Sequence, residues 1–170
     1  RCWGFAGLNL MRLQVVDSLE LNTFEFSQNY FMFWDKLEKA NYFLENIIKS
    51  RDESYESRLI THLLKAPVQD GGQWDMFVNL INKYGAVPKD VMPETNHSSK
   101  SGAMNYILTH KLREFASILR KKPAKNSVSL KKDMMETIYN LLAMFLGQPP
   151  DFINWSTRNK DNRHIVISDM

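Results

Sequence analysis

The apolar residues of this chain recur at intervals of three or four positions, and this spacing constrains the fold more than any other feature. The first example runs from Phe5 through Leu8, Met11 and Val15 to Leu19, which is one face of an α-helix. The same spacing returns in later segments, so we predict a mainly helical chain. Helices are expected at 2–19, 27–48, 53–65 and 73–84, with two more inside 102–147.

The place of a residue in these patterns predicts whether it is buried. The aromatic side chains of Tyr30, Phe33 and Trp34 could form a ligand site, but core packing is the simpler interpretation at helical spacing. Asp35 and Lys39 are four positions apart and are expected to pair on the solvent side of that helix. Others expected in the interior are Leu59, Ile60, Leu63, Leu64, Trp74, Phe77, Val78, Ile81, Ile107, Leu108, Leu112, Phe115 and Leu119.

Capping residues and prolines mark where the helices should begin and end. Ser27 suits the N-cap of the second helix, Gly85 suits the position after the fourth, and Pro149 closes the last. From Asn154 onward the sequence indicates a loop and then a strand at 165–170, with no visible partner strand. Because the chain starts on arginine and stops within this strand, we expect it to be an internal piece of a longer protein.

Composition narrows the class of protein. A hydrophobic fraction of 44% and an aromatic fraction of 12% are typical of a globular chain. No run approaches the roughly 20 apolar residues that a membrane helix needs. The one cysteine excludes an internal disulfide and suits a reducing compartment. The four histidines, His62, His97, His110 and His164, show no metal-ligand spacing, and no phosphate-binding glycine loop occurs, so we expect neither a metal nor a cofactor.

The single cysteine, Cys2, stands where the first helix should begin. Unpaired backbone N–H groups and the positive end of the helix dipole favour a thiolate there, and the thiolate is the nucleophile. Small residues at Gly4, Ala6 and Gly7 would let this helix lie close against a neighbour. The simpler interpretation of a lone cysteine is a small buried hydrophobe, so its surroundings must decide.

Asp70, Gly71 and Gly72 form the second informative stretch. Paired glycines permit a positive φ and let another backbone approach without a Cβ in the way. The alternative is an ordinary turn ahead of the next helix.

Taken together, these motifs resemble those of papain-like cysteine peptidases, and more narrowly those of the bleomycin hydrolase and aminopeptidase C family. Cys2 followed by Trp3 and Phe5 at a helix start is similar to the nucleophile segment of such peptidases. The resemblance runs in order from Arg1 to about Asp161. It rests on Arg1-Cys2-Trp3, Phe5-Ala6-Gly7-Leu8-Asn9, Phe26-Ser27-Gln28, Phe33-Trp34-Asp35-Lys36-Leu37-Glu38-Lys39, Asp70-Gly71-Gly72-Gln73-Trp74-Asp75-Met76, Lys83-Tyr84-Gly85, Val87-Pro88-Lys89 and Pro93-Glu94.

The resemblance implies an α+β papain-like cysteine peptidase fold, of which this chain would be a predominantly helical part. It implies a helical domain over 1–95 that carries the nucleophile helix. A helical insertion over 96–150 and the start of a β region over 151–170 would follow.

The resemblance also implies a chemistry. Cys2 would attack a peptide carbonyl, while Gly71 and Gly72 would line the cleft and bind the backbone of a peptide substrate. The family's histidine and asparagine would lie beyond residue 170 and its oxyanion glutamine before Cys2. None of the four histidines would then act as the base, and the chain alone would be inactive. The family enzyme is a cytoplasmic homohexamer that uses no cofactor.

A second hypothesis is a non-enzymatic helical module that binds an anionic partner such as nucleic acid through the basic segment 100–132. A solvated helix face explains the basic excess more simply. The acidic residue within this segment is Glu114. The basic residues are Lys100, Lys111, Arg113, Arg120, Lys121, Lys122, Lys125, Lys131 and Lys132.

Overall fold

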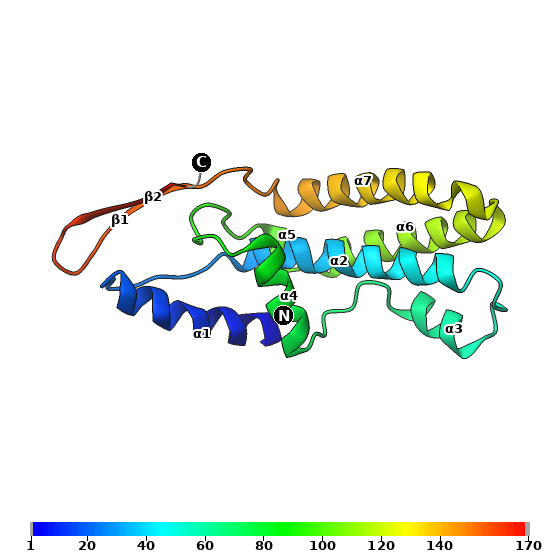
Figure 1. Cartoon of the computed structure of the whole chain (residues 1–170), viewed down its shortest axis with the longest axis horizontal. Coiled ribbons are helices and arrows are strands. Elements are labelled where there is room, and N and C mark those ends of the chain that lie inside the picture. Colours follow the sequence, from blue (N-terminus) through cyan, green and yellow to red (C-terminus); the bar gives the residue numbers. More distant parts are fainter. Residues whose placement is uncertain (1, 169–170) are drawn as a thin grey trace.

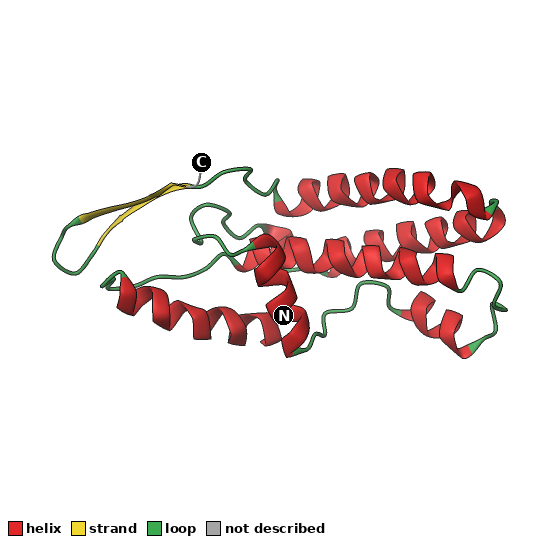
Figure 2. Ribbon diagram, viewed as in Figure 1, coloured by secondary structure: helices red, strands yellow, loops and turns green. Residues whose placement is uncertain are grey.

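The structure is a computed structural model that describes residues 2–168. Helices form at each place where the apolar spacing predicted them, so the mainly helical fold is confirmed (Figure 2). The elements in order are α1 (Cys2–Ser18), α2 (Gln28–Lys49), α3 (Arg58–Lys65), α4 (Trp74–Tyr84), α5 (Asn96–Ser99), α6 (Gly102–Lys121), the 3-10 helix η1 (Ala124–Asn126), α7 (Ser127–Leu146), β1 (Asn154–Arg158) and β2 (His164–Ser168).

Three long helices, α2, α6 and α7, pack side by side and enclose the larger hydrophobic core (Figure 1). Each contributes fully buried apolar side chains at helical spacing, such as Phe43 from α2, Leu112 from α6 and Ile138 from α7. This core therefore joins residues from both sides of position 95. The division into a domain over 1–95 and an insertion over 96–150 stays a prediction.

The first helix, α1, lies against α2 and α4 over a second, smaller core. Leu8 meets Phe31 and Phe77 there. A Cβ on Gly4 would lie 2.4 Å from the ring of Phe31, and one on Gly7 would lie 2.5 Å from the ring of Phe77. Small residues therefore bring α1 close to its neighbours, as the sequence predicted for Gly4 and Gly7.

Three residues expected in the interior are exposed instead. Leu59 is 48% exposed because α3 begins only at Arg58 and turns the side chains of Ile60 and Leu63 toward the core. Trp74 is 59% exposed at the first position of α4, where its ring stacks on Phe77. Ile107, 41% exposed, lies on the outer side of α6.

The terminal strand has a partner, contrary to the sequence interpretation. β1 and β2 form an antiparallel hairpin in which Trp155 pairs with Ile167 (Figure 2). The partner was missed because Asn154–Arg158 is polar and its pairing is set by the turn that follows. The Trp155 ring packs on Phe24, 5.6 Å between centroids. Positions 169 and 170 of the predicted strand lie outside the described residues.

Two arginines of the basic segment bind backbone carbonyls at helix ends. Arg113 donates to the carbonyls of Leu64 (2.9 Å) and Lys65 (3.2 Å), the last two residues of α3. Such carbonyls have no partner within their own helix, so a cation there supplies the missing donors. Arg120 acts in the same way just after α2, where it donates to the carbonyls of Ser50 (2.9 Å) and Glu53.

Lysines in the same segment form ion pairs. Lys111 bonds Glu114 within α6, and Lys131 of α7 bonds Glu45 of α2. None of the helices within residues 2–168 is long and apolar enough to cross a membrane.

Replacing Arg120 with alanine should lower the free energy of unfolding by about 1.5–3 kcal/mol, since hydrogen bonds to a charged group are lost. Lys121→Ala is the matched control because it removes the same charge from an exposed neighbouring position and should change stability by less than about 0.5 kcal/mol. Urea denaturation measures both. Equal effects would show that Arg120 contributes only net charge.

Candidate active site

Cys2 occupies the first position of α1 and is exposed. It is therefore not the small buried hydrophobe of the simpler interpretation. Its neighbour Trp3 is half-buried, with its ring edge-on to Phe31 at 5.2 Å between centroids. The indole Nε1 of Trp3 donates a hydrogen bond of 2.9 Å to the carbonyl of Asp70. The residue after the cysteine is thus joined to a loop 67 positions away.

That loop, residues 66–73, is called the glycine loop here because it contains Gly71 and Gly72. A Cβ on Gly72 would lie 2.4 Å from the indole ring of Trp3, whereas one on Gly71 would meet nothing within 4 Å. Among the described glycines, Gly85 and Gly147 have a positive φ, and the pair in the loop does not. Gly72 is therefore required by the approach of an indole ring, rather than by a special backbone conformation or the approach of another backbone.

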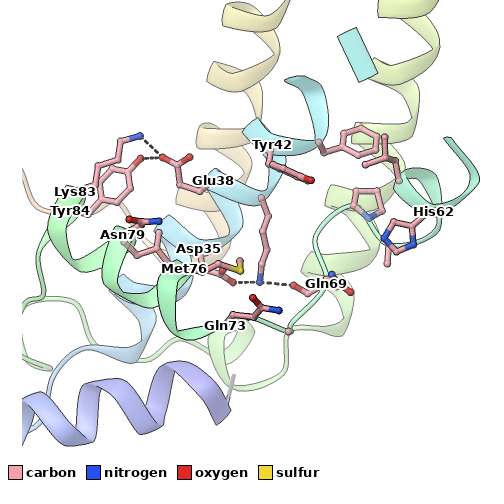
Figure 3. A pocket seen from close by; sticks show the side chains of 18 of the residues that line it. Asp35, Glu38, Tyr42, His62, Gln69, Gln73, Met76, Asn79, Lys83 and Tyr84 are labelled. Atoms are coloured by element: carbon pink, nitrogen blue, oxygen red, sulfur yellow. Dashed lines mark hydrogen bonds and ion pairs between the residues drawn. The ribbon is translucent and has the colours of Figure 1, made fainter. Parts of the chain in front are cut away.

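Two lysines of α2 hold the glycine loop in place. The Nζ of Lys36 donates to the carbonyl of Val68 at 2.7 Å and to Oδ1 of Asp70 at 2.5 Å. One turn further on, the Nζ of Lys39 donates to Oδ2 of Asp35 at 2.8 Å and to the carbonyl of Gln69 at 2.8 Å (Figure 3). Both lysines therefore join α2 to the loop.

The pairing of Asp35 with Lys39 is confirmed, but the prediction that the pair lies on the solvent side of α2 is wrong. Their side chains are only 8% and 10% exposed, because the glycine loop crosses this face of α2. Lys36 is more enclosed still, with 1% of its side chain exposed. Sequence reasoning missed Lys36. The available signal was its position between Phe33 and Ala40 on the buried stripe of α2, where a lysine needs buried acceptors.

Burial and charge act in opposite directions on the ionisable groups of this site. Burial raises the pKa of Asp35 although Lys39 and Lys36 lower it, and burial lowers the pKa of Lys39 although Asp35 raises it. Burial would also raise the pKa of Asp70, but the hydrogen bond and charge of Lys36 outweigh it, so that pKa is lowered. Asp70 is therefore held as a carboxylate beside the ammonium group of Lys36.

A cavity of about 920 Å³ opens beside the glycine loop. It lies between α2, α3, α4 and the loop, and both Gly71 and Gly72 line it (Figure 3). Polar side chains such as Gln73 and Asn79 border it as well. Cys2 is not among the residues that line this cavity.

The four histidines lie on separate elements. His62 is in α3, His97 in α5, His110 in α6 and His164 in β2. No group of three or more His, Cys, Asp or Glu side chains within residues 2–168 is arranged to hold a metal ion.

Gly71 and Gly72 offer a matched pair of substitutions. Gly72→Ala should lower the free energy of unfolding by about 1–3 kcal/mol, because the new methyl group overlaps the Trp3 ring. Gly71→Ala should change it by less than about 0.5 kcal/mol, since that position faces open space. Gly72→Ala thus tests the contact of this position with the Trp3 ring, separately from any role of the loop in binding substrate. Thermal or urea unfolding that ranks the two variants alike would exclude the packing role of Gly72.

Known proteins match this chain over nearly its whole length. The model of the Peptidase C1-like family matches residues 1–170. Aminopeptidase C of Listeria innocua serovar 6a is 54% identical over 164 residues, covering 95% of this chain and 37% of that protein. Bleomycin hydrolase of Oryctolagus cuniculus is 43% identical over 174 residues, covering 98% of this chain and 63% of that protein.

Among solved structures, PepW from Lactobacillus rhamnosis HN001 superposes with a TM-score of 0.95 at 44% identity. The match covers 100% of this chain and 39% of that one. The chain thus spans 37% of the length of the first relative and 39% of the solved structure. The likeness confirms the papain-like peptidase fold, with this chain as a helical part of it. The chain belongs to the Peptidase C1-like family.

Proposed function

We propose that this chain is the nucleophile-bearing part of a cysteine aminopeptidase, with Cys2 as the nucleophile. The observation that carries the proposal is the exposed thiol at the first position of α1, joined through Trp3 to a loop with two glycines. The names of the similar proteins, Aminopeptidase C and Bleomycin hydrolase, support the reaction class.

The reaction begins when the Cys2 thiolate attacks the carbonyl carbon of the first peptide bond of a substrate. A C–S bond forms, the C–N bond breaks, and the departing amine takes a proton from an imidazolium group. Water then attacks the thioester and the imidazole takes one of its protons. The C–S bond breaks, the carboxylic acid leaves, and the thiolate and the imidazolium are restored. The imidazole, the asparagine that orients it and the oxyanion glutamine would come from segments outside residues 1–170.

Gly71 and Gly72 are proposed to bind the backbone of the peptide substrate. Gly71 is exposed and has no neighbour within 4 Å of its Cβ position, so a substrate strand can approach its backbone. By resemblance to the family, we also propose that the full-length protein is a cytoplasmic homohexamer.

Binding of nucleic acid through the segment 100–132 is the less favoured alternative. Arg113 and Arg120 bond backbone carbonyls, and Lys111 and Lys131 form ion pairs, so these side chains already have partners in the chain. Exposed lysines remain at Lys100, Lys121, Lys122, Lys125 and Lys132. Affinity for an oligonucleotide that fell steeply with rising salt would favour this alternative.

In the full-length protein, Cys2→Ala should lower kcat/KM for a fluorogenic aminoacyl amide by at least about 10³-fold, because no other group replaces the nucleophile. His110→Ala, an exposed position in α6, is the control and should keep wild-type turnover. Turnover in the Cys2→Ala protein that matched the wild type would end the proposal. Loss of activity in His110→Ala would place a base within this chain.

A further inference from the structure

We propose that Lys36 and Lys39 of α2 are positioning residues for catalysis, because they hold the glycine loop against Trp3, the neighbour of Cys2. This inference rests on the proposed peptidase function. It goes beyond that function by assigning a task to two buried lysines, which form hydrogen bonds to Val68, Gln69 and Asp70 of the loop.

The first step is the burial of Lys36. Its side chain is 1% exposed, and a buried ammonium without acceptors is strongly unfavourable. Its two acceptors, the carbonyl of Val68 and the carboxylate of Asp70, both belong to the glycine loop. If the loop moved away from α2, this charge would be left buried without them. The loop is therefore held at a fixed distance from α2.

The second step is the double contact of Lys39. Its Nζ donates to the carbonyl of Gln69 in the loop and also lies 5.4 Å from the ring centroid of Trp3. A cation at this distance is attracted by the face of an indole ring. Asp35, on the same helix, keeps this ammonium group paired. One lysine thus contacts both the loop and the residue next to the nucleophile.

The third step joins the loop to Trp3 directly. The indole N–H binds the carbonyl of Asp70, whose carboxylate binds Lys36. The indole ring fills the space beside Gly72 that a side chain would otherwise occupy. A shift of the loop would therefore displace both the substrate-binding backbone and the residue after Cys2. Misplacement by about 1 Å can cost about 10²-fold in rate.

A merely structural role for the lysines predicts a different result. Variants would then unfold at lower temperature, but the folded fraction would keep its catalytic constants. Lys131 provides the matched control because it also forms an ion pair with α2, through Glu45, and that pair joins α2 to α7 rather than to the loop.

The experiment uses the full-length protein, with kcat/KM for a fluorogenic aminoacyl amide normalised to active sites titrated by iodoacetamide. Measurements are made well below the melting temperature of each variant. Lys36→Met should lower kcat/KM by at least about 10-fold, whereas Lys131→Met should stay within about 2-fold of wild type. Trp3→Phe keeps an aromatic ring but loses the indole N–H, so it should lower kcat/KM as well.

Double variants show whether two substitutions affect kcat/KM through the same set of contacts or independently. Lys36→Met combined with Trp3→Phe should lower kcat/KM by less than the product of the single effects, because both break the same link. Lys131→Met combined with Trp3→Phe should lower kcat/KM by the product of the two single effects. If Lys36→Met does not fold, Lys39→Met takes its place in the same cycle, with the same expected result.

Two failures can be told apart. A wild-type protein without aminoacyl amide turnover contradicts the proposed function. If the wild-type protein is active, two results contradict the positioning role alone. One is an unchanged kcat/KM in both Lys36→Met and Lys39→Met. The other is a double variant whose loss of kcat/KM equals the product of the two single losses.

Discussion

Lys36 carries a positive charge into a closely packed helix face, and the glycine loop supplies the two acceptors that stabilise it there. Asp70 is half-exposed, but the ammonium group of Lys36 is buried, and a buried ammonium that loses its acceptors is strongly destabilising. The contact therefore acts mainly by specifying geometry. It sets where the loop runs, and the loop in turn sets the position of Trp3 through the carbonyl of Asp70. Within the described residues, the start of α1 is in this way linked to the middle of α2.

This link explains why the chain combines small residues and buried charges around one helix end. Gly4 and Gly7 bring α1 against the rings of Phe31 and Phe77, and Gly72 leaves space for the ring of Trp3. The ammonium group of Lys39 lies over the same indole ring. Close approach at Gly72 and the charge of Lys39 thus both act on the ring of Trp3. Cys2, with its exposed thiol, precedes this tryptophan by one peptide bond.

Much of the fold could be predicted from local sequence, because helix periodicity and caps are local. The side chain of Ser27 accepts from the backbone N–H of Tyr30, and Gly85 follows α4 with φ of 71°, both as expected. The burial of Asp35 and Lys39 could not be predicted in this way. It depends on a loop 30 residues further along the chain crossing their face of α2. The need for glycine at position 72 likewise comes from a ring distant in the sequence, and the strand partner of Ile167 depends on hairpin register. Cys2 and the two glycines are predicted as site residues through the resemblance, whereas the contacts around Trp3 and Gly72 are visible only in three dimensions.

The central claim is that the buried lysines hold the glycine loop against Trp3. The most direct measurement is the rate of solvent exchange of the Trp3 indole N–H, followed by NMR in protein labelled with ¹⁵N at tryptophan. Loss of the Lys36 contact should release the Asp70 carbonyl, so exchange in Lys36→Met should be at least about tenfold faster than in wild type. The indole groups of Trp34, Trp74 and Trp155 serve as internal references and should keep their rates. An unchanged rate for Trp3 in a folded Lys36→Met protein would contradict the account.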